Sequence, residues 1–423
     1  MSKLTPEQIA KIRKKEAETP DALKRNPLNK YTEGWFHVTL NVRGEAPVLG
    51  YIVGDADAED DSEDAPRCEL TELGKAVENE WKGINRFYPF CSCEEIQVMP
   101  EHIHALLHLM PGNNGHLGRI INGLMIGCTH YYWDTLGIPW REMRNHLEET
   151  LKRRMQIDKN ASYNEESKAL RSEWQDRDHT CSYRGPSLFV RGYNDVEAVT
   201  EEEIEIKRQY IRNNPRKRLI TRSKPDRFRV VRDNHSVNWT LDRAFSAITN
   251  DPLFAKNPDR CRESQQSVNQ RLKRIANTDI LAIDYVGNRE LLASPRKISL
   301  ICHRKDAAHF ELQKSAVLDA ARTGAVVVSA FISPKEREIM KQLMLEQLPF
   351  IEIMDNGFSD RYKPVGKAFY STAENRHVQM SCWAYLYQAM SEENNSISRE
   401  MCLVMNELVR LISGVEDDWW KVD

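Results

Sequence analysis

Residues 98–109 alternate between two kinds of side chain, and this alternation constrains the fold more than any other feature of the chain. His102, His104 and His108 stand at even positions, and apolar residues fill the odd positions from 103 to 109. Successive side chains of a β-strand point to opposite faces. The pattern therefore predicts a strand with one face in a core and another that presents two imidazoles side by side. His108 lies roughly 13 Å beyond His104, at about 3.3 Å per residue, which is too far to share an ion with it.

Strand and helix patterns around this segment predict an α+β domain. Their order indicates a small antiparallel sheet with helices stacked on one face, which leaves the histidines on the open face. The acidic stretch from Asp55 to Asp64 is expected to be a solvated loop, because its like charges repel and it lacks apolar anchors. The expected elements are a strand pair, 36–42 and 48–53, joined through 43–47, a helix over 70–81, strands 94–99 and 102–109, and a helix over 117–136.

The chain changes character beyond residue 281, where apolar strand patterns alternate with helical ones. Such alternation predicts an α/β domain built on a parallel sheet that is covered on both faces. The expected strands are 297–302, 325–331, 350–354 and 377–381, with helices over 307–322, 334–347, 363–374 and 398–412.

The length of 423 residues suggests two or three domains. No apolar run approaches the roughly 18 residues of a membrane span. The nine cysteines are an odd number without a Cys-x-x-Cys pair, which favours free thiols and a cytoplasmic protein. A monomer and a homodimer are equally open.

The sequence patterns divide the chain into five parts. They are an N-terminal helical tail (1–30), a first domain (31–236), a helical linker (237–280), the α/β domain (281–390), and a C-terminal helix and tail (391–423). The first domain includes a charged insert (141–183), which is a helical pair or a partly ordered excursion.

A second pattern follows about a hundred residues after the histidine pair. Thr200 and Glu203 form a capping box that opens a helix carrying Tyr210. Asn214 lies four residues after Tyr210, so in an α-helix the two side chains share a face, and Pro215 should end that helix at Asn214 or within a residue. Two histidines alone bind a metal weakly and more often only pack. An amide oxygen one helical turn from a phenol supplies a further ligand beside a nucleophile.

These two patterns carry a family resemblance. The string Val98-Met99-Pro100-Glu101-His102-Ile103-His104 resembles the His-hydrophobic-His motif of HUH single-tyrosine transposases, and Tyr210-Ile211-Arg212-Asn213-Asn214-Pro215 resembles the Tyr-Ile-x-x-Asn-Pro motif of the REP-associated tyrosine transposases. The similarity extends over about residues 36–219 and includes Gly192-Tyr193-Asn194-Asp195. It departs from the family in the acidic loop and in the insert at 141–183. The resemblance implies a ferredoxin-like HUH fold for this region.

The resemblance also implies a reaction. His102, His104 and Asn214 would hold Mg or Mn, and Tyr210 would attack a phosphodiester of single-stranded or hairpin DNA. Cleavage through a covalent phosphotyrosine can be reversed without ATP, so the implied activity is strand cleavage and rejoining, as in DNA transposition. A free tyrosine, with a pKa near 10, needs such assistance at neutral pH.

A basic segment follows the tyrosine helix. The net formal charge of the chain is only −3, so a DNA surface must come from local clustering. Residues 212–235 hold nine Lys or Arg against two Asp, a composition that suits phosphate contacts. The expected DNA contacts are Arg212, Arg216, Lys217, Arg218, Arg222, Lys224, Arg227 and Arg229.

The second region is faintly similar to the Rossmann-like domain of DNA-processing protein A, through residues 287–292, 326–333 and 355–358. Residues 302–306, which follow the first parallel strand, contain no glycine, and this argues against nucleotide binding. Side chains at strand ends predict a ligand site for DNA or a phosphate, made by Arg304, Lys305, Asn356 and Arg361.

Two alternatives to the transposase interpretation remain. One is a domesticated, catalytically inactive DNA-binding or regulatory protein, and the other is a nucleotide-binding enzyme that works through the C-terminal domain.

Overall fold

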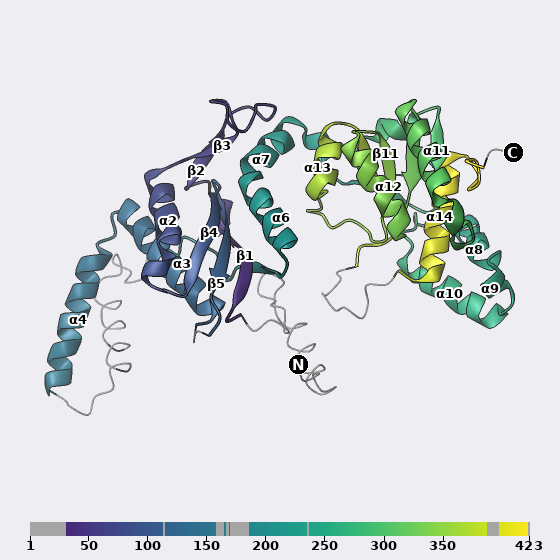
Figure 1. The fold of residues 1–423 in the computed structure, drawn as a ribbon. Coiled ribbons are helices and arrows are strands. Elements are labelled where there is room, and N and C mark those ends of the chain that lie inside the picture. The colour runs from purple at the N-terminus through teal and green to yellow at the C-terminus, as the bar shows by residue number, and fades with distance from the viewer. Residues whose placement is uncertain are drawn as a thin grey trace. The chain divides into compact units, whose positions relative to one another are not determined.

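The computed structural model describes residues 31–112, 115–157, 165, 169, 186–234, 237–386 and 397–421. The expected N-terminal helical tail and most of the insert after residue 157 lie outside the described residues. The chain divides into two compact units (Figure 1). The division falls between Leu219 and Ile220. The sequence had assigned residues up to 236 to the first domain, whereas in the structure residues 220–234 belong to the second unit.

The first unit contains a four-stranded antiparallel sheet in the order β4-β5-β1-β6. The expected pairing of the first two strands along the chain is wrong. β1 already pairs with β5 on one side and with β6 on the other, so neither of its edges is available, and β2 pairs with β3 in a separate two-stranded sheet. The strands are β1 (Gly34–Asn41), β2 (Gly50–Val53), β3 (Arg67–Leu70), β4 (Cys91–Val98), β5 (His102–Leu109) and β6 (Asn194–Ala198).

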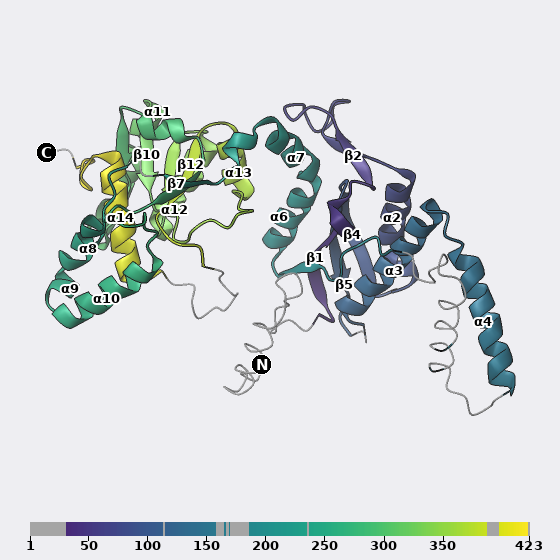
Figure 2. The same ribbon diagram turned by 180° about the vertical axis from the view of Figure 1, so that it is seen from behind.

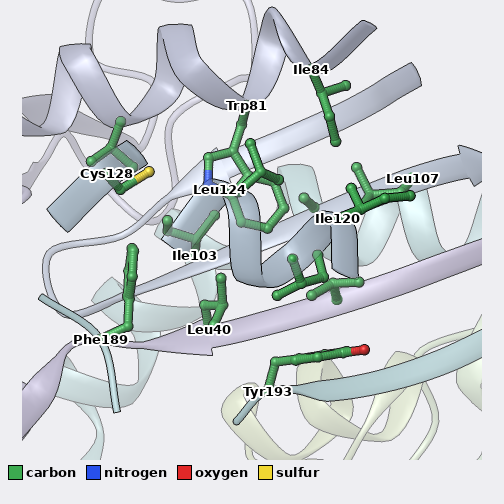
Figure 3. Close-up of a cluster of buried hydrophobic side chains, with 14 of the residues drawn as sticks. Leu40, Trp81, Ile84, Ile103, Leu107, Ile120, Leu124, Cys128, Phe189 and Tyr193 are labelled. Carbon is green, nitrogen blue, oxygen red and sulfur yellow. The ribbon is translucent and has the colours of Figure 1, made fainter. Parts of the chain in front are cut away.

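Helices cover both faces of this sheet. Ile103 and Leu107 of β5 point into an apolar core with Trp81 of α2 (Glu72–Lys82) and Leu124 of α3 (Leu117–Thr135) (Figure 3). On the other face lies α6 (Glu201–Arg212), which appears opposite α2 and α3 in Figure 1. The expectation of helices on one face alone is therefore wrong. The apolar side chains of α6 pack against the even-numbered face of β5, where the histidines lie.

The other helices of the first unit extend from this body. The start of the charged insert, whose structure the sequence left open, is helical in α4 (Trp140–Ile157), and α7 (Asn214–Ser223) begins directly after α6 and runs across the division between the units. Short 3-10 turns are η2 (Arg43–Glu45) and η3 (Ile84–Arg86).

The second unit is built on a six-stranded mixed sheet in the order β7-β8-β12-β11-β10-β9. The four strands predicted from the sequence pair in parallel, as expected. Two strands that were not expected, β8 and β7, extend the sheet in antiparallel fashion beyond β12. The strands are β7 (Val231–Asn234), β8 (Ile283–Gly287), β9 (Lys297–Ser299), β10 (Val326–Ser329), β11 (Phe350–Ile353) and β12 (His377–Ser381).

Apolar cores lie on both faces of this sheet. Val326 and Val328 of β10 point into one core, and Val327 points into the other. The first core is covered by α8, α10 and α14, of which α8 and α14 pack side by side (Figure 2), and the second by α11 and α12. The helices are α8 (Leu241–Thr249), α9 (Pro252–Ala255), α10 (Pro258–Arg271), α11 (Phe310–Arg322), α12 (Pro334–Leu345), α13 (Gly366–Ala373) and α14 (Arg399–Ser413), with 3-10 turns η4 (Pro225–Arg227), η5 (Arg289–Ala293) and η6 (Arg304–His309).

None of the helices in the described part of the chain combines the length and the apolar character that a bilayer crossing needs.

Candidate functional site

Strand β5 places His102 and His104 next to each other. Its odd-numbered side chains are buried in the core of the first unit, so the two imidazoles lie on the opposite face. Their ring centroids are 4.8 Å apart and their planes are nearly perpendicular. His108, farther along the same face, stacks on Trp35 with centroids 4.4 Å apart. The alternation of the sequence thus produces the expected neighbouring pair and keeps His108 in a separate contact.

Helix α6 brings Tyr210 to this pair. Thr200 and Glu203 form the capping box predicted for its first turn. Ile204 and Ile211 of α6 are buried against Leu106 of β5 and hold the helix on the sheet. The Tyr210 ring lies beside His104, with centroids 5.4 Å apart. The tyrosine that the sequence singled out and the histidine pair therefore meet on one face of the sheet.

Two other tyrosines, Tyr131 and Tyr132, are excluded from this role by their position. Both pack against the core that lies between the sheet and α2 and α3, and the Tyr131 hydroxyl donates to Glu80 Oε2 at 3.2 Å. That core is on the opposite face of the sheet from His104.

His37 of β1 is a member of the site that sequence reasoning missed. Its Nε2 lies 3.2 Å from Nδ1 of His104, and its ring centroid is 5.4 Å from that of Tyr210. The neighbouring Thr39 sits directly opposite His104 in the β1–β5 register, and its Oγ1 is 3.0 Å from the same Nδ1. The available signal was the alternation of β1, in which Phe36 and Val38 are core residues and His37 is on the histidine face.

Helix α6, which carries Tyr210, ends at Arg212, slightly earlier than expected. Asn214 is therefore the first residue of the next helix, α7. Its Nδ2 donates to the carbonyl oxygens of Tyr210, at 2.7 Å, and Ile211, at 3.4 Å. These bonds keep Asn214 against the last turn that carries Tyr210. They occupy the donor side of the amide and leave its carbonyl oxygen for another partner.

Glu101 is a second residue that was missed. Its Oε1 forms an ion pair with Nη2 of Arg218 at 2.8 Å and lies 3.4 Å from Nδ1 of His102. All three side chains are largely shielded from solvent. Arg218, which the sequence assigned to DNA, is thus bound to a carboxylate of the site, and that carboxylate also orients His102.

Burial sets the protonation of the site. It lowers the pKa of His37 to about 4, with Lys207 adding a smaller effect. Burial together with the neighbouring cationic groups holds the pKa of His104 well below its usual range, and burial also lowers the pKa of His102 despite Glu101. The three imidazoles are therefore neutral near pH 7, the form in which an imidazole nitrogen can bind a metal. Burial raises the pKa of the Tyr210 phenol, which is therefore protonated at the same pH.

The remaining basic residues of the predicted DNA segment have different surroundings. Arg212 pairs with Glu95 at 2.7 Å, and Arg216 pairs with Asp60 of the acidic loop at 2.8 Å. Lys217 lies over the Tyr210 ring, with Nζ 4.3 Å from the centroid. In the second unit, Arg222 and Lys224 are exposed, Arg229 lies 3.8 Å from Asp226, and Arg227 donates to Asn288 at 3.0 Å.

The second unit contains a cavity of about 1200 Å³ beyond the ends of β9 and β10, bordered by α8 and α14. Arg304 and Lys305 line it, together with Ser333 at the start of α12. Asn356 and Arg361 are not among its lining residues. The Asn356 amide instead closes a loop, since Nδ2 donates to the Leu386 carbonyl at 2.8 Å. The structure therefore separates the four residues that the sequence grouped into one ligand site.

No set of three or more His, Cys, Asp or Glu side chains is arranged to hold a metal ion where the structure describes the chain. A metal at the histidine pair would thus need a ligand of another type. The amide oxygen of Asn214, held beside Tyr210, is of a type that Mg and Mn accept.

No family model matches the chain. An uncharacterised protein of Haemophilus influenzae is 23% identical to this chain over 82 residues. The match covers 19% of this chain and 39% of that protein, so the chain spans less than half the length of that relative. Among solved structures, a candidate transposase of Deinococcus radiodurans R1 is 13% identical with a TM-score of 0.22, and the match covers 45% of this chain and 97% of that one. DNA processing protein A of Helicobacter pylori, described with its single-stranded DNA binding, is 18% identical with a TM-score of 0.24, over 34% of this chain and 66% of that one. These values do not place the chain in a family.

Proposed function

We propose that the first unit cleaves and rejoins single-stranded or hairpin DNA through a covalent phosphotyrosine, as the transposases that share its two motifs do. One observation carries the proposal: the Tyr210 ring lies 5.4 Å from the ring of His104, which is itself next to His102. A potential nucleophile and two neutral imidazoles thus share one sheet face.

The donor set fits a divalent cation. His102 and His104 each make their side-chain contacts through Nδ1, so Nε2 of each ring remains for a metal, and Asn214 supplies an amide oxygen. A bound Mg or Mn would neutralise charge on the scissile phosphate and polarise its oxygens. Lys217 places a cation over the Tyr210 ring, with Nζ 4.3 Å from the centroid, while burial raises the pKa of the phenol.

The step balances without another reactant. A proton leaves the phenol of Tyr210, its oxygen forms a bond to phosphorus, and the bond from phosphorus to the 3′-oxygen of the preceding nucleotide breaks. That 3′-oxygen takes up a proton. The new phosphotyrosine is a diester like the bond it replaces, so a 3′-hydroxyl can attack it and rejoin the strand.

The test is covalent capture on DNA. The full chain is incubated with Mn²⁺ and hairpin oligonucleotides that carry single-stranded flanks, and adducts are detected as a shifted band on a denaturing gel. We expect an adduct with the native protein and with Tyr131→Phe, whose tyrosine lies on the opposite sheet face. Tyr210→Phe should give none. If the native protein forms no adduct, or if Tyr210→Phe forms it equally well, the proposal fails.

For the second unit, the cavity favours a separate binding function. We propose that it takes a phosphate-bearing ligand, either DNA or a smaller molecule, at Arg304 and Lys305. Ligands of open α/β sheets collect beyond the carboxyl ends of the strands. Two cationic side chains at that edge suit an anionic group.

A further inference from the structure

The two nitrogens of the His104 ring have different surroundings. Nδ1 is 3.2 Å from His37 Nε2 and 3.0 Å from Thr39 Oγ1, so both neighbours on β1 approach the same ring atom. Nε2 has no hydrogen bond among the described residues. One side of the ring is thus engaged within the sheet, and the other remains for a ligand.

The proton on Nδ1 decides whether His104 can bind a metal. A neutral imidazole carries one ring proton, so Nε2 has a free lone pair only when that proton is on Nδ1. Nδ1 must then donate to an acceptor. If His37 instead donated from its own Nε2, the proton of His104 would move to Nε2 and block the metal.

His102 has a comparable arrangement. Its Nδ1 faces Glu101 Oε1 at 3.4 Å, and a carboxylate can only accept from it. A ligating histidine almost always donates its other N–H to such a partner, which fixes the orientation of the ring and makes it a better ligand. His104 has no carboxylate at its Nδ1, and His37 occupies the corresponding place.

We propose that His37 is the positioning residue of the metal site: its Nε2 accepts the Nδ1 proton of His104 and keeps Nε2 of His104 for a divalent cation. The inference rests on the proposed function for the metal itself. His37 touches neither substrate nor metal in this scheme and acts through His104. Both rings are buried, His37 at 8% and His104 at 6% exposed, so water has little access to the proton between them.

Three variants of the full chain distinguish the loss of a hydrogen-bond acceptor at position 37 from the loss of packing there. His37→Phe keeps an aromatic ring but removes the acceptor, and it should weaken Mn²⁺ binding by about 10-fold to 100-fold, the usual effect of losing such a partner. His37→Gln places an amide oxygen near the former Nε2 and should restore affinity to within a few-fold of the native protein. His108→Phe, on the same strand face, is the matched control and should leave Mn²⁺ affinity unchanged. Affinity is measured by calorimetry, and melting curves without metal verify that each variant is folded.

A second readout needs no metal. ¹⁵N imidazole NMR of the native full chain should show His104 protonated on Nδ1, whereas His37→Phe should show a mixture of the two forms. If the native protein does not bind Mn²⁺, the proposed function fails, yet the NMR spectrum still tests the role of His37. Protonation of His104 on Nε2 in the native protein overturns the inference. So do equal affinities of His37→Phe and the native protein, or a large loss in Thr39→Val alone, which would make Thr39 the acceptor.

Discussion

Nη2 of Arg216 lies 2.8 Å from Oδ1 of Asp60, although 156 residues separate the two in the sequence. The same guanidinium also donates to the carbonyl of Ala56. The acidic stretch from Asp55 to Asp64, expected to be only a solvated loop, is thus attached to the first turns of α7. Since the Arg216 side chain is only 16% exposed, the loop shields one of the cations assigned to DNA.

Asp60→Asn should therefore raise the affinity for single-stranded DNA. Release of Arg216 adds a cation for a phosphate, and we expect about a twofold to fivefold gain, the equivalent of roughly 0.4–1 kcal/mol. The salt dependence should also steepen by about one phosphate contact. Fluorescence anisotropy at several salt concentrations measures both. Asp61→Asn is the control, because it removes the same charge from a residue that does not pair with Arg216. An equal gain in DNA affinity in this control would show that the effect comes from net charge alone.

Folding stability should fall as the pH drops from about 6.5 towards 4. The pKa of His37 is about 4 in the folded protein, against about 6.5 for a free histidine, because of its burial. Between these values the unfolded chain binds the proton and the folded chain does not, so acid favours unfolding. The effect of His37 alone approaches about 3 kcal/mol, at about 1.36 kcal/mol per pKa unit. Urea unfolding at pH 7.5 and pH 5 measures the loss. His37→Phe should show a smaller one, and an unchanged loss would contradict this explanation.

The cavity of the second unit should bind inorganic pyrophosphate through Arg304 and Lys305. At a concentration of 100 times Kd, such binding stabilises a folded protein by about 2.7 kcal/mol, which raises Tm by several degrees. The double variant Arg304→Ala, Lys305→Ala should lose this shift in thermal melting. Arg361→Ala, outside the cavity lining, should keep it. A native protein without any shift would remove the basis for a phosphate ligand there.

Asp284 should be essential for the stability of the second unit. The carboxylate is 1% exposed and accepts from Arg232 at 2.9 Å and from Lys273 at 2.8 Å. Asp284→Ala leaves two cations without their shared partner, and we expect a loss of about 3 kcal/mol in urea unfolding, because removing one member of a buried pair is costly. Asp360 also pairs with Arg232 but is 99% exposed. Asp360→Asn should therefore lower the free energy of unfolding by less than about 1 kcal/mol. Similar losses in the two variants would show that the burial of Asp284 does not explain its contribution to stability.

The features that sequence could predict are those that a single segment determines. The alternation of β5 assigned its two faces because the period of two is a property of one strand. The four parallel strands of the second unit could be recognised because each is a short apolar run followed by a helical pattern. The capping box of α6 depends on two residues three positions apart, and it too was confirmed.

The features that escaped prediction depend on residues far apart in the chain. β1 was assigned the wrong partner because pairing depends on which edges other strands occupy. The alternation of β1 assigned His37 to the face opposite Phe36 and Val38, but a single histidine on such a face is ordinary and did not point to a site. Only the register of Thr39 opposite His104 brings it to the site. Arg216 and Arg218 were assigned to DNA from charge alone, and their acidic partners lie more than a hundred residues earlier in the sequence.

Tyr210 and the imidazoles are not held in place by equally extensive packing. The histidine strands belong to an extensive core, whereas α6 is attached through a small cluster in which Ile204 and Ile211 meet Leu106 and Ala198. Local opening requires less free energy where few apolar contacts must be broken. We therefore expect α6 to open at a lower free energy than the sheet, and Ile211→Ala, which removes part of this small cluster, to displace Tyr210 while the strands that carry the histidines stay paired.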